Sequence, residues 1–192
     1  MACARDAHPL DTDFGNLEES PQWKRLLVDF QSLVSTGRLY GNEEGEMTVQ
    51  TRQEVLAVLE GDWASYVRRF RSLSPDEQSA FLAKQGYARI GDLLAHVVAW
   101  WQMGYRAIES YIADPQFQAA DCDVDSFNAE AVARASGLDD EALIASFEKM
   151  RSFLCDFVKA LPEAAFENEK VVKQFNMEIV GHLSEHNLPE KE

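Results

Sequence analysis

Two histidines lie four residues apart near the end of the sequence. They are His182 and His186, within residues 180–187 (VGHLSEHN). In a helix, residues four apart lie on one face in neighbouring turns, so both imidazoles can reach one metal ion. A third histidine, His96, lies within an apolar helical pattern, and the fourth, His8, lies in a polar N-terminal stretch. The residue types and spacing therefore predict a metal site formed by His96, His182 and His186.

Three neutral imidazoles leave at least one coordination position open, which is typical of a catalytic metal site. Such a metal would lower the pKa of bound water, or would hold a thiolate cosubstrate as the nucleophile. Imidazole ligands suit several divalent ions, and we expect zinc or nickel, with iron as a further candidate. The alternative for His96 is a hydrogen-bonded core residue of an ordinary helix.

Three acidic residues are candidates for assisting this site. Glu178 and Glu185 flank the two C-terminal imidazoles, and Asp62 falls within the apolar arc of an earlier helix. For each, the sequence favours a solvated or partly exposed helix charge, with a role in a polar site as the alternative. Trp100 and Met103 are candidates for a pocket wall, although such side chains more often serve in packing.

Length and composition limit the fold and the partners. A chain of 192 residues with 46% hydrophobic residues can bury one sizeable core. A net charge of -15 would repel a phosphate backbone, so we expect no nucleic-acid partner. There is no apolar stretch long enough to span a membrane, no secretory leader pattern, and no zinc-finger spacing among the three cysteines. We therefore expect a soluble, cytoplasmic protein.

Helical signals recur along the sequence. Thr51 and Glu54 form a predicted capping box, and Ser74 and Pro75 begin a short helix that ends before Gly86. Apolar residues spaced by three and four predict four long helices, over residues 51–73, 90–111, 139–161 and 170–187. A further short amphipathic helix is predicted over residues 22–34. We therefore divide the chain into an N-terminal extension, residues 1–48, and a helical bundle domain, residues 49–192.

The order of the helices tests the metal-site prediction. His96 lies near the start of the second long helix, whereas His182 and His186 lie near the end of the fourth, so these helices must be antiparallel for the rings to meet. The connection over residues 112–138 has roughly 27 residues, far more than the usual 2 to 8 between bundle helices. Such a connection allows a crossover along the bundle. We therefore predict an all-α four-helix bundle with up-down-down-up topology.

Four motifs in this order carry a resemblance to a known family. They are IGDLLAH at residues 90–96, DVDSFNA at 123–129, ALPE at 160–163 and GHLSEH at 181–186. Together they resemble the DinB/YfiT-like superfamily of metalloenzymes, over about residues 50–189, and the middle and C-terminal motifs are most similar to its ClbS/DfsB branch. The resemblance implies the same bundle topology and a divalent metal held by three histidines, which map onto His96, His182 and His186.

The resemblance also implies a range of activities. Some relatives are thiol-dependent transferases, and others hydrolyse or sequester small reactive molecules. We therefore expect a metal-dependent hydrolase or thiol transferase that acts on a small molecule, with a thiol as a candidate cosubstrate. Two alternatives stay open: a protein that sequesters a small molecule without turnover, and an interaction module whose histidines are incidental. A homodimer is a compatible assembly.

Overall fold

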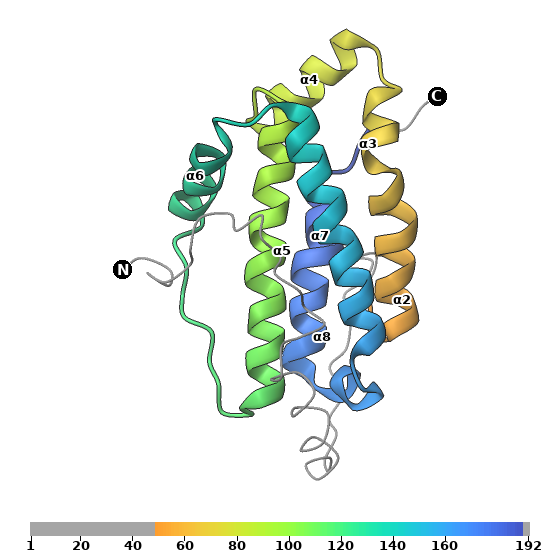
Figure 1. The fold of residues 1–192 in the computed structure, drawn as a ribbon, viewed down its shortest axis with the longest axis vertical. Helices are drawn as coiled ribbons and strands as arrows, with labels where there is room; N and C mark the ends of the chain where they lie inside the picture. The colour runs from red at the N-terminus through yellow and green to blue at the C-terminus, as the bar shows by residue number, and fades with distance from the viewer. Residues whose placement is uncertain (1–48, 190–192) are drawn as a thin grey trace.

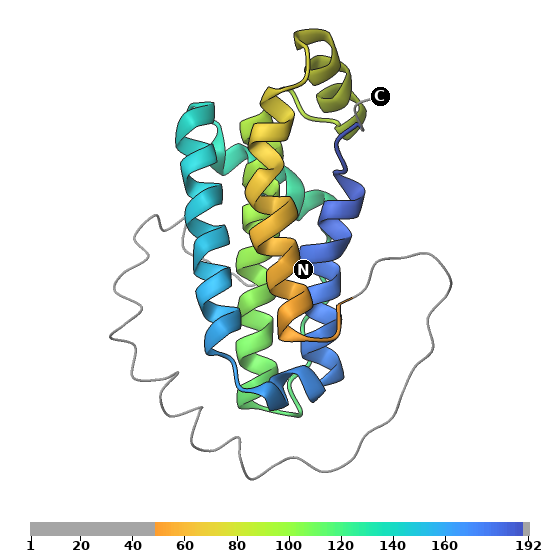
Figure 2. The same ribbon diagram turned by 90° about the vertical axis from the view of Figure 1, so that its right-hand side faces the viewer.

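The computed structural model describes residues 49–189, which are largely helical and contain no strand. The long helices lie side by side as a bundle, with shorter helices at one end and along one flank (Figures 1 and 2). The all-helical class is therefore confirmed for these residues. The extension over residues 1–48, with its predicted helix at 22–34, lies outside the described part of the chain. None of the described helices is long and apolar enough to cross a membrane.

Four long helical rods run along the bundle. Two of these rods are single helices, and each of the other two consists of consecutive helices with a π-helical turn between them. The first rod comprises α2 (Arg52–Ala57), η3 (Val58–Trp63) and α3 (Ala64–Arg71); two uninterrupted helices follow, α5 (Ile90–Ala113) and α7 (Asp140–Ala160); the last rod comprises α8 (Glu169–Phe175), η5 (Asn176–Gly181) and α9 (His182–Glu185). The shorter helices are α4 (Pro75–Gln85), α6 (Val124–Ala135) and the 3-10 helix η4 (Glu163–Glu167). These elements agree closely with the ranges that periodicity predicts.

Local hydrogen bonds start two helices at the predicted residues. The Thr51 hydroxyl accepts a bond from the backbone N–H of Glu54 (3.3 Å), while the Glu54 carboxylate accepts one from the N–H of Thr51 (2.9 Å). Ser74 and Glu77 form the same reciprocal pair at the start of α4. Gly86 ends α4 with φ of +80°, a conformation that glycine adopts without strain.

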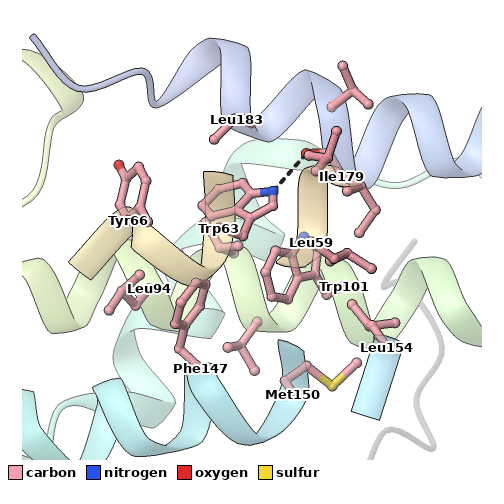
Figure 3. Close-up of a cluster of buried hydrophobic side chains, with 14 of the residues drawn as sticks. Leu59, Trp63, Tyr66, Leu94, Trp101, Phe147, Met150, Leu154, Ile179 and Leu183 are labelled. Atoms are coloured by element: carbon pink, nitrogen blue, oxygen red, sulfur yellow. Dashed lines mark hydrogen bonds between the residues drawn. The ribbon is translucent and has the colours of Figure 1, made fainter. Parts of the chain in front are cut away.

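Large aromatic rings fill the centre of the bundle (Figure 3). Trp63 meets Trp101 edge to face with 5.1 Å between ring centroids, and Phe147 stacks 5.2 Å from Trp101. All three side chains are buried. Contacts of this kind contribute about 0.5–1.5 kcal/mol each beyond the burial of area. These rings come from the first rod, α5 and α7. The apolar faces predicted for these helices therefore pack together in one core.

The two π-helical turns are the main local departure from the predicted helices. The turn η3 lies against η5, and a π turn replaces bonds between residues i and i+4 by bonds between i and i+5. Trp63 donates its indole N–H to the carbonyl of Ile179 (2.9 Å), and Trp101 donates to the carbonyl of Glu178 (2.8 Å). Both carbonyls belong to η5, so tryptophans from two other rods hold this turn in place (Figure 3 draws the first of these bonds).

Ion pairs identify which helix ends are neighbours. Arg52, at the start of the first rod, pairs with Glu163 (2.8 Å), just after the end of α7. Arg89, just before α5, pairs with Asp140 (3.4 Å), the first residue of α7. The beginnings of α5 and α7 therefore lie together, and the beginning of the first rod lies beside the end of α7 (Figure 1).

The long connection between α5 and α7 contains α6, as the helical pattern after Asp123 predicts. The Asp123 side chain caps α6 by accepting a hydrogen bond from the N–H of Ser126 (2.9 Å). Phe127 then places its ring 4.6 Å from that of Trp100 in α5, and Asn128 accepts a bond from the Trp100 indole N–H (2.8 Å). These contacts fasten α6 to the flank of α5.

Replacing Trp63 or Trp101 by phenylalanine removes a donor from a buried carbonyl of η5. We expect each variant to lower the free energy of unfolding by about 1–3 kcal/mol, measured by urea denaturation. Trp100→Phe is the matched control, because it loses similar ring volume but frees only the side-chain amide of Asn128. Equal losses in all three variants would contradict the importance of the two backbone contacts.

Candidate metal centre

The three histidines predicted as ligands lie close together in the structure. His96 is in the second turn of α5, His182 begins α9, and His186 follows α9 directly. Their exposed fractions are only 5–8%. The ring centroids are 5.3 Å apart for His96 and His182, 5.2 Å for His96 and His186, and 5.9 Å for His182 and His186. The fold thus gathers rings from two distant parts of the sequence into one buried triangle, the histidine cluster.

The spacing of the histidine cluster can be compared with that of a metal site. With metal–nitrogen bonds of about 2.0–2.1 Å, three imidazoles around a tetrahedral ion have centroids about 5.2 Å apart. The centroid distances in the cluster are close to this value. As the side chains stand, however, no group of three or more His, Cys, Asp or Glu residues within 49–189 is arranged so that it could hold a metal. The rings would therefore have to turn about their side-chain bonds to direct three nitrogens at one point.

Hydrogen bonds determine which nitrogen carries the proton in two of the rings. The amide of Gln85 places its oxygen 2.8 Å from Nδ1 of His186 and donates its N–H to the carbonyl of Glu185 (3.3 Å). Because that carbonyl can only accept, the amide orientation is set and Nδ1 of His186 is the donor. Nδ1 of His182 likewise donates to the carbonyl of Met177 (3.2 Å). Nε2 of both rings therefore bears the lone pair, as in metal-binding histidines with an oriented ring.

Two fully buried nitrogens of the histidine cluster have no hydrogen-bond partner among residues 49–189. They are Nδ1 of His96 and Nε2 of His186, and both are buried. Buried polar atoms nearly always have a partner, so an unpartnered atom requires an explanation. A divalent cation fits the chemistry of these atoms, because neutral imidazole nitrogens are common metal ligands.

Burial keeps the three imidazoles neutral. It lowers the pKa of His96 to about 3, with His182 and His186 adding to the shift and the side chain of Asn128 opposing it. Burial, assisted by His182, lowers the pKa of His186 to about 4. It also lowers the pKa of His182, where the bond to the Met177 carbonyl acts in the opposite direction. The rings are therefore in the form that binds a metal without having to release a proton first.

Glu178 is buried beside the histidine cluster, so the favoured interpretation of a solvated helix charge is wrong. Its exposed fraction is 3%, and its Oε1 accepts a bond from Gln174 (2.8 Å). Burial raises the pKa of Glu178 to about 8, with the bond from Gln174 opposing the shift. Its other oxygen has no hydrogen-bond partner in the described part of the chain and lies 3.6 Å from Nδ1 of His182. Since burial favours the neutral form of both groups, this contact is not an ion pair in the metal-free protein.

A glycine makes room for Glu178. A Cβ at position 104 of α5 would lie 2.5 Å from Cγ of Glu178, closer than such atoms approach. The absence of a side chain at Gly104 therefore lets the carboxyl side chain pack against α5. Glu185, by contrast, is exposed, as the sequence predicts.

A pocket of about 820 Å³ opens beside the histidine cluster, a volume typical of small-molecule sites. His96, His182 and Glu178 line it, and Trp100 forms part of its wall, which was the less favoured of the two interpretations of this residue. Asp62 lines the same pocket and is partly exposed, which agrees with its position at the edge of the apolar stripe. Met103 is not among the residues that line the pocket and is partly buried in α5, which agrees with the favoured packing role.

Four residues near the site were not singled out from the sequence. Gln85 orients His186, and Gln174 bonds to Glu178. Tyr87 lies 5.7 Å from the ring of His96, and Asn128 bonds to Trp100 in the pocket wall. Only Asn128 could have been suspected from the sequence, because it lies in the motif DVDSFNA (residues 123–129) that resembles the DinB/YfiT-like superfamily.

Comparisons of the chain with protein-family models, curated proteins and solved structures yield no significant match.

The metal-free protein is expected to be most stable near pH 6.5. Below about pH 6.5 the unfolded chain takes up protons on His96 and His186 before the folded chain does, so stability falls. Between about pH 4.5 and 8, Glu178 is ionised in the unfolded chain but protonated in the folded chain. Its contribution therefore lowers the free energy of unfolding as the pH rises through this range. Thermal unfolding between pH 4.5 and 8.5 with a chelator measures both effects.

Glu178→Gln isolates the alkaline side of this profile. We expect this variant to lose less stability than the unmodified protein between pH 6.5 and 8, because it has no proton to release. Glu167→Gln, at an exposed position of η4, is the matched control. An unchanged slope in Glu178→Gln would contradict a buried, protonated carboxyl group.

Proposed function

We propose that this protein is a DinB-like metal-binding protein in which His96, His182 and His186 hold one divalent cation in an open site, and that it is a metal-dependent enzyme acting on a small molecule. The observation that carries the proposal is the buried triangle of neutral imidazoles. The motifs that resemble the DinB/YfiT-like superfamily imply the same three ligands. Zinc or nickel is the proposed ion, with iron as a further candidate, because imidazole suits all three.

The proposed architecture is a four-helix bundle with up-down-down-up topology. The ion pair of Arg89 with Asp140 supports parallel α5 and α7, and that of Arg52 with Glu163 supports an antiparallel first rod and α7. With α5 and the last rod antiparallel, a histidine near the beginning of α5 lies beside two near the end of the last rod. The connection through α6 then returns the chain along the bundle.

The residues around the histidine cluster suit chemistry on a small molecule. A bound divalent ion supplies a Lewis acid and lowers the pKa of a bound water or thiol. Glu178 lines the same pocket and changes protonation near neutral pH, which is the requirement for a general acid or base. Gln85 and the Met177 carbonyl orient two of the rings. Hydrolysis and thiol transfer are the two reaction classes that we propose.

The second candidate is a protein of the same fold that binds a small molecule without turnover. This candidate is favoured by the hydrogen bond that Gln174 donates to Glu178. The bond occupies one carboxyl oxygen and holds the side chain along its own rod. Two assays on metal-loaded protein separate these candidates: release of a chromophore from an ester, and consumption of cysteine or glutathione with an alkylating dye. Loss of turnover in Glu178→Gln with metal binding retained would support the enzyme.

Protein purified without an affinity tag is expected to bind one equivalent of Zn²⁺ or Ni²⁺, measured by calorimetry and elemental analysis. His96→Ala and His182→Ala should each abolish stoichiometric binding, because each removes one of three ligands. Circular dichroism verifies that the variants fold. His8→Ala, which changes the one histidine outside the proposed set, is the control. Unchanged 1:1 binding in the first two variants would overturn the proposal.

Gln85→Ala tests the orientation of His186 separately from ligation. Loss of a partner that orients a metal-binding histidine typically weakens metal affinity about 10- to 100-fold, and we expect a change of this size. Gln78→Ala is the matched control, because Gln78 lies in the same helix and its side-chain amide donates to the backbone carbonyl of Leu73, away from the histidine cluster. Equal zinc affinities of the two variants, measured by competition with a chelating dye, would contradict the orienting role.

A further inference from the structure

Exposed apolar side chains gather at the pocket beside the histidine cluster. In the part of the chain that the structure describes, the exposed large hydrophobic residues are Val124 (51%), Met177 (49%) and Leu138 (39%). Val124 and Met177 both line the pocket that contains His96 and His182, whereas Leu138 does not. Two of these three residues, from the separate elements α6 and η5, therefore face one site.

Contacts of neighbouring groups connect the elements that carry both residues to the histidine cluster. Phe127, one turn after Val124, lies 4.6 Å from the ring of Trp100, and that ring lies 5.8 Å from His182. On the other side, the Met177 carbonyl accepts the Nδ1 proton of His182. Apolar surface thus extends from the beginning of α6, across Trp100, to the imidazoles and η5.

The aromatic part of the pocket wall has a fixed shape. The Trp100 indole N–H bonds to Asn128 (2.8 Å), and the ring is only 9% exposed. A rigid aromatic wall with exposed apolar residues beside convergent polar groups is the usual composition of a small-molecule site. Hydrophobic residues scattered singly over a surface need no explanation, whereas Val124 and Met177 line the same pocket.

We propose that this pocket binds a small molecule with an apolar alkyl or aryl arm, which packs between Val124 and Met177 against Trp100 while a polar head group reaches the histidine cluster. The head-group part rests on the proposed metal function. The arm site rests independently on the exposure of the two side chains and on their place in the pocket.

Straight-chain hydroxamic acids test the arm site, because the hydroxamate binds a metal and the chain length can be varied. On zinc-loaded protein, calorimetry should show affinity rising about two- to fourfold for each added methylene, so on the order of 20- to 200-fold from acetohydroxamate to hexanohydroxamate. The double variant Val124→Thr/Met177→Gln, which keeps side-chain size but adds polarity, should reduce this gain to less than about fivefold. The gain is expressed relative to the affinity of the same variant for acetohydroxamate, so any change in metal binding itself cancels. Leu138→Gln is the matched control and should keep the full gain.

The outcomes separate this inference from the proposed function. If zinc binds but affinity does not rise with chain length, or if Leu138→Gln loses as much of the gain as the double variant, the arm site is overturned and the metal site stands. If zinc does not bind, the proposed function fails, and the dye anilinonaphthalenesulfonate tests the arm site on metal-free protein. Dye binding that is weakened in the double variant and kept in Leu138→Gln would support the arm site, and equal binding in both variants would overturn it.

Discussion

The indole hydrogen bonds to η5 are the interactions on which the histidine end of the molecule depends. Trp63 and Trp101 reach the carbonyls of two successive residues from different rods. One added residue in a helical turn rotates all later side chains by about 100°. This turn buries three consecutive residues, Glu178, Ile179 and Val180. Because the turn directly precedes His182, the direction of the C-terminal rings is set by contacts in the aromatic core.

Features that depend on nearby residues were predictable from the sequence. The capping boxes at Thr51 and Ser74 require only groups three residues apart, and the apolar spacing identified the long helices. The approach of His96 to the two C-terminal histidines was also predictable, because helix direction follows from connection length and the positions of the residues. The π turns were not, since apolar residues spaced by three or four are compatible with one extra residue in a turn.

Features that depend on two distant elements could not be predicted. The burial of Glu178 requires the missing side chain at Gly104 in a neighbouring helix, and neither residue alone indicates that contact. Gln85 and His186 are 101 positions apart, and the glutamine lies at the end of a short helix with no apparent role in a site. A glutamate in an amphipathic helix is usually solvated, so the general rule for its type was misleading here.

The amide of Gln85 joins a short helix outside the four rods to the residues that follow the last one. One end of the amide holds the ring of His186, and the other holds the carbonyl of Glu185. Elements with few buried contacts open more often than a bundle core, and most residues of α4 are exposed or only partly buried. An opening at the end of α4 would therefore free the ring of His186 while the Tyr66 hydroxyl still holds the His186 carbonyl (2.7 Å). For an ion bound as proposed, release can then begin with this one ring while the aromatic core stays folded.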